Sequence, residues 1–276
     1  MKIYRKNIVS VETKNDLSEF YILPAGIALN KYEIKSNEKN HLILNSLNKD
    51  NDDFSKLIKL DKKPLSKTYS FITKRGNKKK QLRISLVYEN EVLLKCINII
   101  NKEHYKPSIP QGLFIALFDK SEVIGVIVFS KLTYTNPKGR KQFFSKVYKT
   151  DEEIKSYGLK KIGWISRIVI SKAYQSDGYG TFFAKKFIDI LLQVFPNGNL
   201  EYIEVLTSWT LDDFKKKGDK NLKVLAEANL EMDNDFLCSA NYHRVDLGKP
   251  SIRISKRGLN NVQKVIQYYY VIKIAK

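Results

Sequence analysis

A short turn with two glycines, between a hydrophobic strand and an amphipathic helix, constrains this chain more than any other feature. The segment Gly163–Leu191 reads GWISRIVISKAYQSDGYGTFFAKKFIDIL. The stretch Ile162–Ser171, which overlaps the start of this segment, is apolar and rich in β-branched residues, as in a buried strand. The following Gly178–Phe195 carries apolar side chains at helical spacing. The sequence therefore predicts a strand that enters a helix through the turn Gln175–Gly180.

The composition of this turn suits a bound phosphate. Backbone N–H groups converge at the start of a helix, where the helix dipole adds a positive partial charge. Gly178 and Gly180 lack side chains that would keep a diphosphate from the backbone, and Thr181 adds a hydroxyl group. The turn is neither a Walker loop nor a GxGxxG motif. The alternative is an ordinary strand–turn–helix without a ligand.

The remaining pattern predicts a mixed α/β fold with helices packed on one twisted sheet. A helix is expected at Glu91–His104, a hairpin turn at Asp119–Glu122, and a polar insertion at Thr135–Lys161. Other strands are expected at Leu82–Tyr88, Gly112–Phe118, Val123–Phe129, Leu200–Thr207 and Gln267–Ile274.

The chain divides into two parts in this interpretation. Residues 1–80 form an N-terminal extension or small domain of unknown role, and residues 81–276 form the main domain. The basic stretch Thr73–Lys80 is expected to be the turn of a long hairpin between Thr68–Ile72 and Gln81–Tyr88.

Charge is the unusual feature of the composition. The 276 residues include 49 Lys and Arg against 29 Asp and Glu, a formal net charge of +20. Such an excess attracts polyanions, although it can also serve solubility alone. Apolar runs are too short to span a membrane, and neither a signal peptide nor a metal cluster is indicated. With only 2 cysteines, a cytoplasmic location is expected, and the oligomeric state stays open.

The turn resembles the acetyl-CoA signature of the GNAT superfamily of acetyltransferases, Gln/Arg-x-x-Gly-x-Gly/Ala. Gln175, Gly178 and Gly180 match it, and the resemblance extends over Leu82 to Lys276. It implies a mostly antiparallel twisted sheet of GNAT type flanked by helices, with acetyl-CoA or another acyl-CoA as cofactor. By this resemblance the backbone of Ile168, Val169 and Ile170 pairs with the pantetheine arm. The pyrophosphate is held by the amides of Ser176, Asp177, Gly178, Tyr179, Gly180 and Thr181.

The resemblance leaves the catalytic groups open. Asn241-Tyr242 stands where the family has a late Gly-Phe pair, and many members carry a Tyr shortly before it to protonate the leaving thiolate. Here that place holds Leu237, so Cys238 or a Tyr from elsewhere is the candidate general acid. Glu204 is the candidate general base, with a structurally paired glutamate as the alternative. A positioned amine does not strictly need a strong base.

A second, shorter resemblance concerns the acceptor. The run His104–Pro107 and the segment Ile165–Ile170 look like the branch that includes phage DNA-modification acyltransferases and ATPase-associated acetyltransferases. In that branch Arg167 would contact an anion near the acceptor, or else pair with a carboxylate. Tyr105 would stack on a base or pack in the core.

Basic residues outside the turn support a polyanionic partner. Four runs are present, and aromatic residues beside the second run could stack on bases. We therefore expect acyl transfer to an amine, foremost on nucleic acid or an RNA-linked acceptor. The alternatives are a protein-lysine or small-amine N-acetyltransferase and an inactive GNAT-like module that binds nucleic acid or a partner. The runs lie within Lys74–Arg83, Lys138–Lys141, Lys215–Lys217 and Arg253–Arg257, and the aromatics are Phe143, Phe144, Tyr148 and Tyr157.

Overall fold

The computed structural model describes residues 65–87, 89–104, 109–110, 112–130, 138–195, 200–209, 235–246, 251–257 and 261–274. It also describes the backbone of five short strands before residue 61. These form a three-stranded sheet, β1-β2-β5, and a separate pair, β3-β4. Their bounds are β1 Ile8–Glu12, β2 Ser18–Ile22, β3 Tyr32–Ser36, β4 Leu42–Ser46 and β5 Ile58–Leu60.

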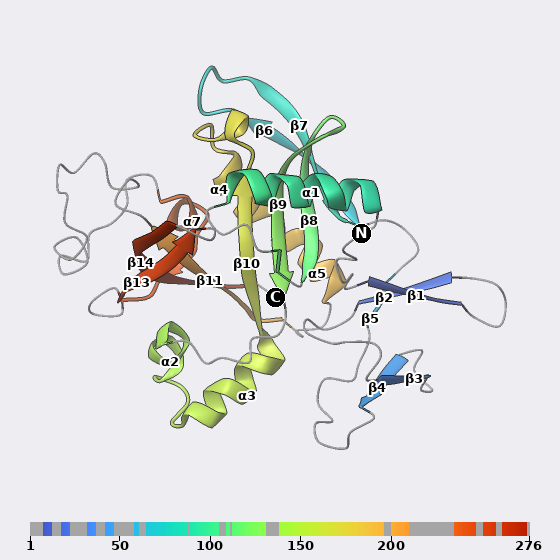
Figure 1. Ribbon diagram of the computed structural model, residues 1–276, viewed down its shortest axis with the longest axis vertical. Coiled ribbons are helices and arrows are strands. Elements are labelled where there is room, and N and C mark those ends of the chain that lie inside the picture. The colour runs from blue at the N-terminus through green and yellow to red at the C-terminus, as the bar shows by residue number, and fades with distance from the viewer. Residues whose placement is uncertain are drawn as a thin grey trace.

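A nine-stranded sheet forms the centre of the molecule (Figure 1). Its strand order is β12-β14-β11-β10-β9-β8-β7-β6, with β13 also paired to β14. Of its pairs, β10 and β11 run parallel and the others antiparallel. The predicted class, a mixed and mostly antiparallel sheet flanked by helices, is therefore confirmed. The strands are β6 Ser66–Ile72, β7 Lys79–Leu86, β8 Leu113–Asp119, β9 Glu122–Ser130, β10 Ile162–Ile170, β11 Tyr202–Trp209, β12 His243–Arg244, β13 Ser251–Arg257 and β14 Asn261–Lys273.

The expected hairpin before residue 88 is confirmed as β6 and β7, which pair antiparallel from Ser66 with Ser85 to Ile72 with Lys79. Because β7 also pairs with β8, the hairpin belongs to the central sheet. The expected boundary at residue 80 thus falls inside β7. Apart from this boundary, the division of the chain into an N-terminal extension and a main domain stays a prediction.

Helices cover both faces of the sheet because its strands alternate apolar side chains on two sides. On one face, α1 (Asn90–Glu103) packs Cys96 and Ile100 against Val126 and Val128 of β9. On the other face lie α4 (Tyr179–Lys186) and α5 (Ile188–Val194), in the same core as Ile127. The one helix expected over Gly178–Phe195 is thus two, since a 3₁₀-type bond from the Ile190 N–H to the Phe187 carbonyl marks a break.

The expected polar insertion contains two helices, α2 (Lys138–Phe144) and α3 (Asp151–Lys161). Thr150 starts α3 with a capping box, since its side chain accepts the Glu153 N–H and the Glu153 side chain accepts the Thr150 N–H. Figure 1 shows both helices near the end of β10 where that strand begins. The insertion is therefore an ordered part of the fold, with a core of its own around Phe144, Ile154 and Ile162.

Within the described ranges no helix is long and apolar enough to cross a membrane.

Candidate active site

The turn after β10 has the conformation that its glycines suggested. A short 3₁₀ helix, η3 (Lys172–Tyr174), follows the strand, and Gly178 is the N-cap residue of α4. Ser176 and Gly178 both have positive φ, at 65° and 90°. Alternating left-handed residues direct successive N–H groups to one side, and such a nest binds anions. The first N–H groups of α4 have no acceptor inside the helix. The turn therefore offers several backbone donors to an anion.

The two glycines are not equivalent in the folded protein, whereas the expectation that both leave room for a diphosphate stays a prediction. Gly178 needs to be glycine for its backbone, because a φ of 90° is unfavourable for other residues. At Gly180, a Cβ atom would lie 3.5 Å from Phe236 and 3.9 Å from Ile170, in ordinary van der Waals contact. Position 180 therefore has room for a methyl group, in agreement with the Gly/Ala alternative of the signature.

Gln175 shapes the turn by a contact with the preceding strand. Its side-chain Nε2 donates a hydrogen bond to the carbonyl oxygen of Ile170, at 2.8 Å. This bond joins the end of β10 to the residue before the nest. The Gln175 amide group is thus engaged with the end of β10, and its place in a cofactor site stays a prediction.

β10 and β11 pair over only part of their lengths. Their parallel pairing joins Ile162–Ile165 of β10 to Tyr202–Val205 of β11. Beyond this, β10 continues along β9 to Ile170, with a register shift between Ile165 and Arg167, and β11 continues along β14. The strands diverge from their common end near α3 (Figure 1). The stretch expected to pair with a pantetheine arm, Ile168 to Ile170, lies in this diverging part of β10.

The tip of the β6–β7 hairpin contacts the turn, which the sequence did not indicate. The Lys74 N–H donates to the carbonyl oxygen of Asp177 at 3.2 Å, and the Arg75 N–H donates to Asp177 Oδ1 at 2.6 Å. The Lys74 side chain passes over Gly178, its Cγ 3.1 Å from where a Cβ would stand. Asp177 thus holds the hairpin, and the first basic run lies beside the candidate cofactor site.

Cys238 lies on the short helix α7 (Phe236–Ser239), beside a carboxylate. Asp235 caps this helix by accepting the N–H groups of Leu237 and Cys238. Its other oxygen accepts the Tyr270 hydroxyl at 2.6 Å and the Cys238 thiol at 3.4 Å. Burial and the hydrogen bond to Asp235 raise the pKa of Tyr270 above its ordinary value. Tyr270 is fully buried whereas Cys238 is exposed, so only the thiol can reach a ligand.

Glu204 occupies a buried charge network with Arg140 and Tyr269. Arg140 Nε donates to Glu204 Oε2 at 3.0 Å, Arg140 Nη2 pairs with Oε1, and the Tyr269 hydroxyl also donates to Oε2. All three side chains are 0% exposed. Burial lowers the pKa of Arg140, but the Glu204 carboxylate reverses this and holds that pKa above its usual value. This is the paired glutamate that the sequence left open as the alternative to a general base.

Arg167 lies where β10 leaves the β11 pairing. Its Nη1 donates to the neighbouring carbonyl of Ser166 at 2.6 Å, and the Ser166 hydroxyl donates to the Val128 carbonyl at 3.0 Å. These bonds orient Arg167 at the register shift. Its role toward an acceptor stays a prediction, and Tyr105 falls outside the described residues.

The second basic run, which was expected to support a nucleic-acid surface, is partly engaged within the protein. Arg140 is buried on Glu204, and Lys141 pairs with Asp151. Phe144 is 3% exposed, and the rings expected to stack on bases pack on one another and on Tyr202. These packing contacts give the expected base-stacking role no support, and a nucleic-acid surface at this run stays a prediction. The spacing of Arg140 and Phe144, one helical turn apart, could have revealed their common buried face.

The third and fourth basic runs give no further support for a nucleic-acid surface. The third, Lys215–Lys217, lies outside the described residues, and for Arg253–Arg257 the structure describes the backbone of β13. Among the described residues, no group of three or more His, Cys, Asp or Glu is placed to hold a metal ion.

Comparison with known proteins finds similarity in structure only. No model of a known protein family matches the chain, and no curated protein matches its sequence. Several solved structures do match. An N-acyl amino acid synthase from uncultured soil microbes is 9% identical, covering 70% of this chain and 89% of its own, with a TM-score of 0.38. A putative arylalkylamine N-acetyltransferase 7 from the mosquito Aedes aegypti is 8% identical, covering 78% and 98%, with a TM-score of 0.42.

A GNAT family acetyltransferase from Elizabethkingia anophelis, with acetyl-CoA bound, is 9% identical, covering 70% and 98%, with a TM-score of 0.32. At such identities the likeness concerns the fold alone. The mixed, mostly antiparallel sheet and its flanking helices agree with the fold class that the sequence predicted.

Proposed function

We propose that this protein is an acyltransferase that moves an acetyl or related acyl group from acyl-CoA to an amine. The observation that carries the proposal is the junction of β10 with α4. A nest with left-handed Ser176 and Gly178 opens a helix there, next to the place where β10 and β11 diverge. Backbone donors for a diphosphate and a diverging strand for an extended arm are thus adjacent. A thioester at the end of such an arm would lie between the two strands.

The reaction needs few groups from the protein. The amine nitrogen attacks the thioester carbonyl carbon, a C–N bond forms, the C–S bond breaks, and CoA leaves as a thiolate. The amine loses one proton and the thiolate takes one up. Positioning supplies much of the rate, because a bound amine and thioester react as one molecule.

Cys238 is the group that we assign to protonation of the thiolate. It is exposed, and it shares α7 with Phe236, whose ring lies 3.5 Å from where a Cβ of Gly180 would stand. The Asp235 carboxylate accepts the thiol and fixes its direction. Glu204 is not assigned the role of base, since both of its oxygens are taken up by Arg140 and Tyr269.

The acceptor class that the net charge of +20 supports is an amine on nucleic acid or an RNA-linked amine. The structure supports this acceptor class less than the sequence does, because Arg140 is buried on Glu204 and Lys141 pairs with Asp151. A protein lysine or a small amine is the alternative acceptor. A GNAT-like module that has lost catalysis and binds nucleic acid or a partner is the other alternative.

Calorimetric titration with acetyl-CoA tests the proposal first. Saturable binding is expected, and no binding at millimolar acetyl-CoA would overturn it. Loss of thioester absorbance is then followed with polyamines, lysine peptides and RNA oligonucleotides as acceptors. Turnover with one class identifies the acceptor, whereas binding without turnover on any of them supports the inactive module.

The role of Cys238 is tested separately with Cys238→Ser and Cys238→Ala. Each should lower turnover and leave acetyl-CoA affinity unchanged, with the loss greatest at high pH, where solvent protonates a thiolate least. Turnover and pH profile equal to those of the parent would remove Cys238 from the mechanism.

A further inference from the structure

We propose that the tip of the β6–β7 hairpin is a second wall of the cofactor site, where Lys74 and Arg75 bind phosphate groups of CoA. Asp177 is the positioning residue that holds this tip on the turn. The inference rests on the proposed function and deepens it. It assigns a role in ligand binding to a basic run that composition alone would give to nucleic acid or to solubility.

The hairpin is fixed in place along the helix that the turn opens. Phe71 of β6 lies 4.6 Å from the Tyr179 ring and 5.0 Å from the Phe182 ring, centroid to centroid. Further along, Tyr69 meets Phe182 edge to face at 5.9 Å. Aromatic pairs at these separations stabilise the packing beyond the area that they bury. The tip therefore cannot swing away from the turn without losing this aromatic contact with α4.

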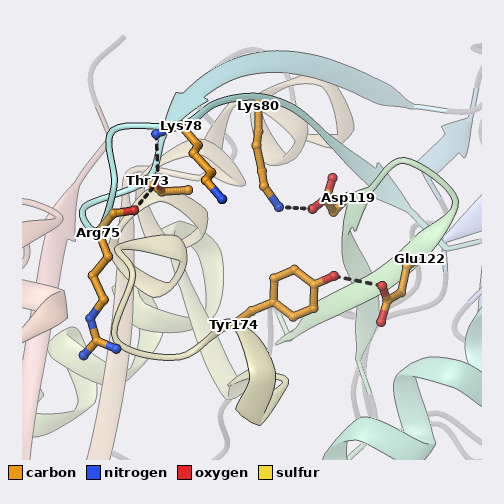
Figure 2. A network of polar contacts seen from close by, with 7 residues as sticks. All are labelled: Thr73, Arg75, Lys78, Lys80, Asp119, Glu122 and Tyr174. Atoms are coloured by element: carbon orange, nitrogen blue, oxygen red, sulfur yellow. Dashed lines mark hydrogen bonds and ion pairs between the residues drawn. The ribbon is translucent and has the colours of Figure 1, made fainter.

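The tip itself is held in one shape by Thr73, which is 3% exposed. The Thr73 hydroxyl donates to the carbonyl of Arg75 at 2.8 Å and accepts the Lys78 N–H at 3.1 Å (Figure 2). Gly76 and Asn77 complete the reversal with positive φ, at 79° and 48°. A tip with this internal bonding presents its cations at defined positions.

The tip of the hairpin carries exposed cationic side chains that could bind an anion. Lys74, Arg75 and Lys78 are exposed. Figure 2 shows Lys78 directed from the hairpin toward the side of Tyr174, whereas Arg75 extends along the outer side of the tip. Lys80 is already engaged, since its Nζ pairs with Asp119 at 2.5 Å and lies 5.6 Å from the centre of the Tyr174 ring. The Lys74 side chain lies against Gly178, with its Cγ 3.1 Å from where a Cβ would stand. Its charge is therefore close to the backbone donors of the turn, and both would act on the same negative charge.

Asp177 would repel a diphosphate if its carboxylate faced the nest. Instead, Oδ1 accepts the Arg75 N–H at 2.6 Å, and its main-chain carbonyl accepts the Lys74 N–H. The one acid of the turn is thereby directed to the hairpin, and the side chains of the two donor residues carry positive charge. An acidic residue within a phosphate-binding turn is explained by this docking role.

The experiment is calorimetric titration of the full chain with CoA and with dephospho-CoA, which lacks the 3′-phosphate. The double variant Lys74→Gln with Arg75→Gln keeps the backbone donors to Asp177 but removes two charges. Its control, Lys146→Gln with Lys155→Gln, removes two charges from exposed positions of the insertion. We expect the tip variant to bind CoA about tenfold or more weakly, as for loss of charge-assisted bonds, and the control to bind like the parent.

Dephospho-CoA identifies the phosphate involved. If the tip variant and the parent bind dephospho-CoA equally, the cations contact the 3′-phosphate, and if the weakening persists, they contact the diphosphate. Asp177→Ala should also weaken CoA binding, while Asp177→Asn, which keeps an acceptor oxygen, should restore it. A parent that binds CoA and a tip variant that binds it equally well would overturn the inference alone. A parent that binds no CoA would overturn the proposed function as well.

Discussion

Replacing Gly178 and Gly180 by alanine, one at a time, should change stability in opposite directions. At Gly178 the φ of 90° makes an L-residue unfavourable by roughly 1–2 kcal/mol. The new Cβ would also lie 3.1 Å from the Lys74 Cγ, which has to shift. At Gly180 the nearest atom to a Cβ is 3.5 Å away, and alanine in a helix is favoured over glycine by about 1 kcal/mol.

Both replacements restrict the unfolded chain equally, because each changes glycine to alanine. The difference between the two variants therefore isolates the folded turn. We expect Gly178→Ala to lower the free energy of unfolding by about 1 kcal/mol and Gly180→Ala to raise it by up to about 1 kcal/mol. Urea unfolding followed by tryptophan fluorescence measures both. Equal stability of the two variants would refute the left-handed turn at Gly178.

Three further results are expected. Arg140→Met leaves the Glu204 carboxylate buried without its cation, so the free energy of unfolding in urea should fall by about 3–5 kcal/mol. The double replacement with Glu204→Leu should recover much of that loss, and additive losses would contradict the paired network. Burial raises the pKa of the Cys96 thiol to about 12, so Cys96 holds its proton at pH 8 and a thiol reagent should modify Cys238 alone. Rapid modification of both cysteines would contradict the burial of Cys96. If nucleic acid is the acceptor, the affinity of the protein for it should fall steeply with salt, with a log–log slope of about 0.9 per phosphate contacted on duplex DNA. Fluorescence anisotropy of labelled DNA and RNA across a salt series measures this affinity. Binding no tighter than that of an unrelated protein of equal charge would leave the net charge of +20 as a solubility feature.

The strand–turn–helix was predictable because its signals are local. An apolar β-branched run, a Gly-x-Gly turn and a helical apolar stripe follow one another within Gly163–Leu191, and each acts on its neighbours in the chain. The hairpins β6–β7 and β8–β9 were predictable for the same reason, since both turns join adjacent strands. The class of the fold followed from the order of these elements.

Contacts between distant segments were not predictable. Arg75 and Asp177 are 102 residues apart, and no local pattern links a basic hairpin to an acidic residue in a glycine turn. The pairing of Arg140 with Glu204 spans 64 residues, and a run such as Lys138–Lys141 is usually a solvated face. Burial of a charge depends on the partner that tertiary packing supplies. From the sequence alone, Glu204 could therefore be either a general base or a structurally paired glutamate.

Amide hydrogen exchange with and without saturating acetyl-CoA tests the central claim most directly. Bound diphosphate should accept hydrogen bonds from the turn, so the amides of Ser176–Thr181 should become protected, together with those of Ile168–Ile170. The amides of α1, on the opposite face of the sheet, should exchange at the same rate in both states. Saturable binding with protection elsewhere and none at Ser176–Thr181 would contradict the cofactor site assigned to this turn.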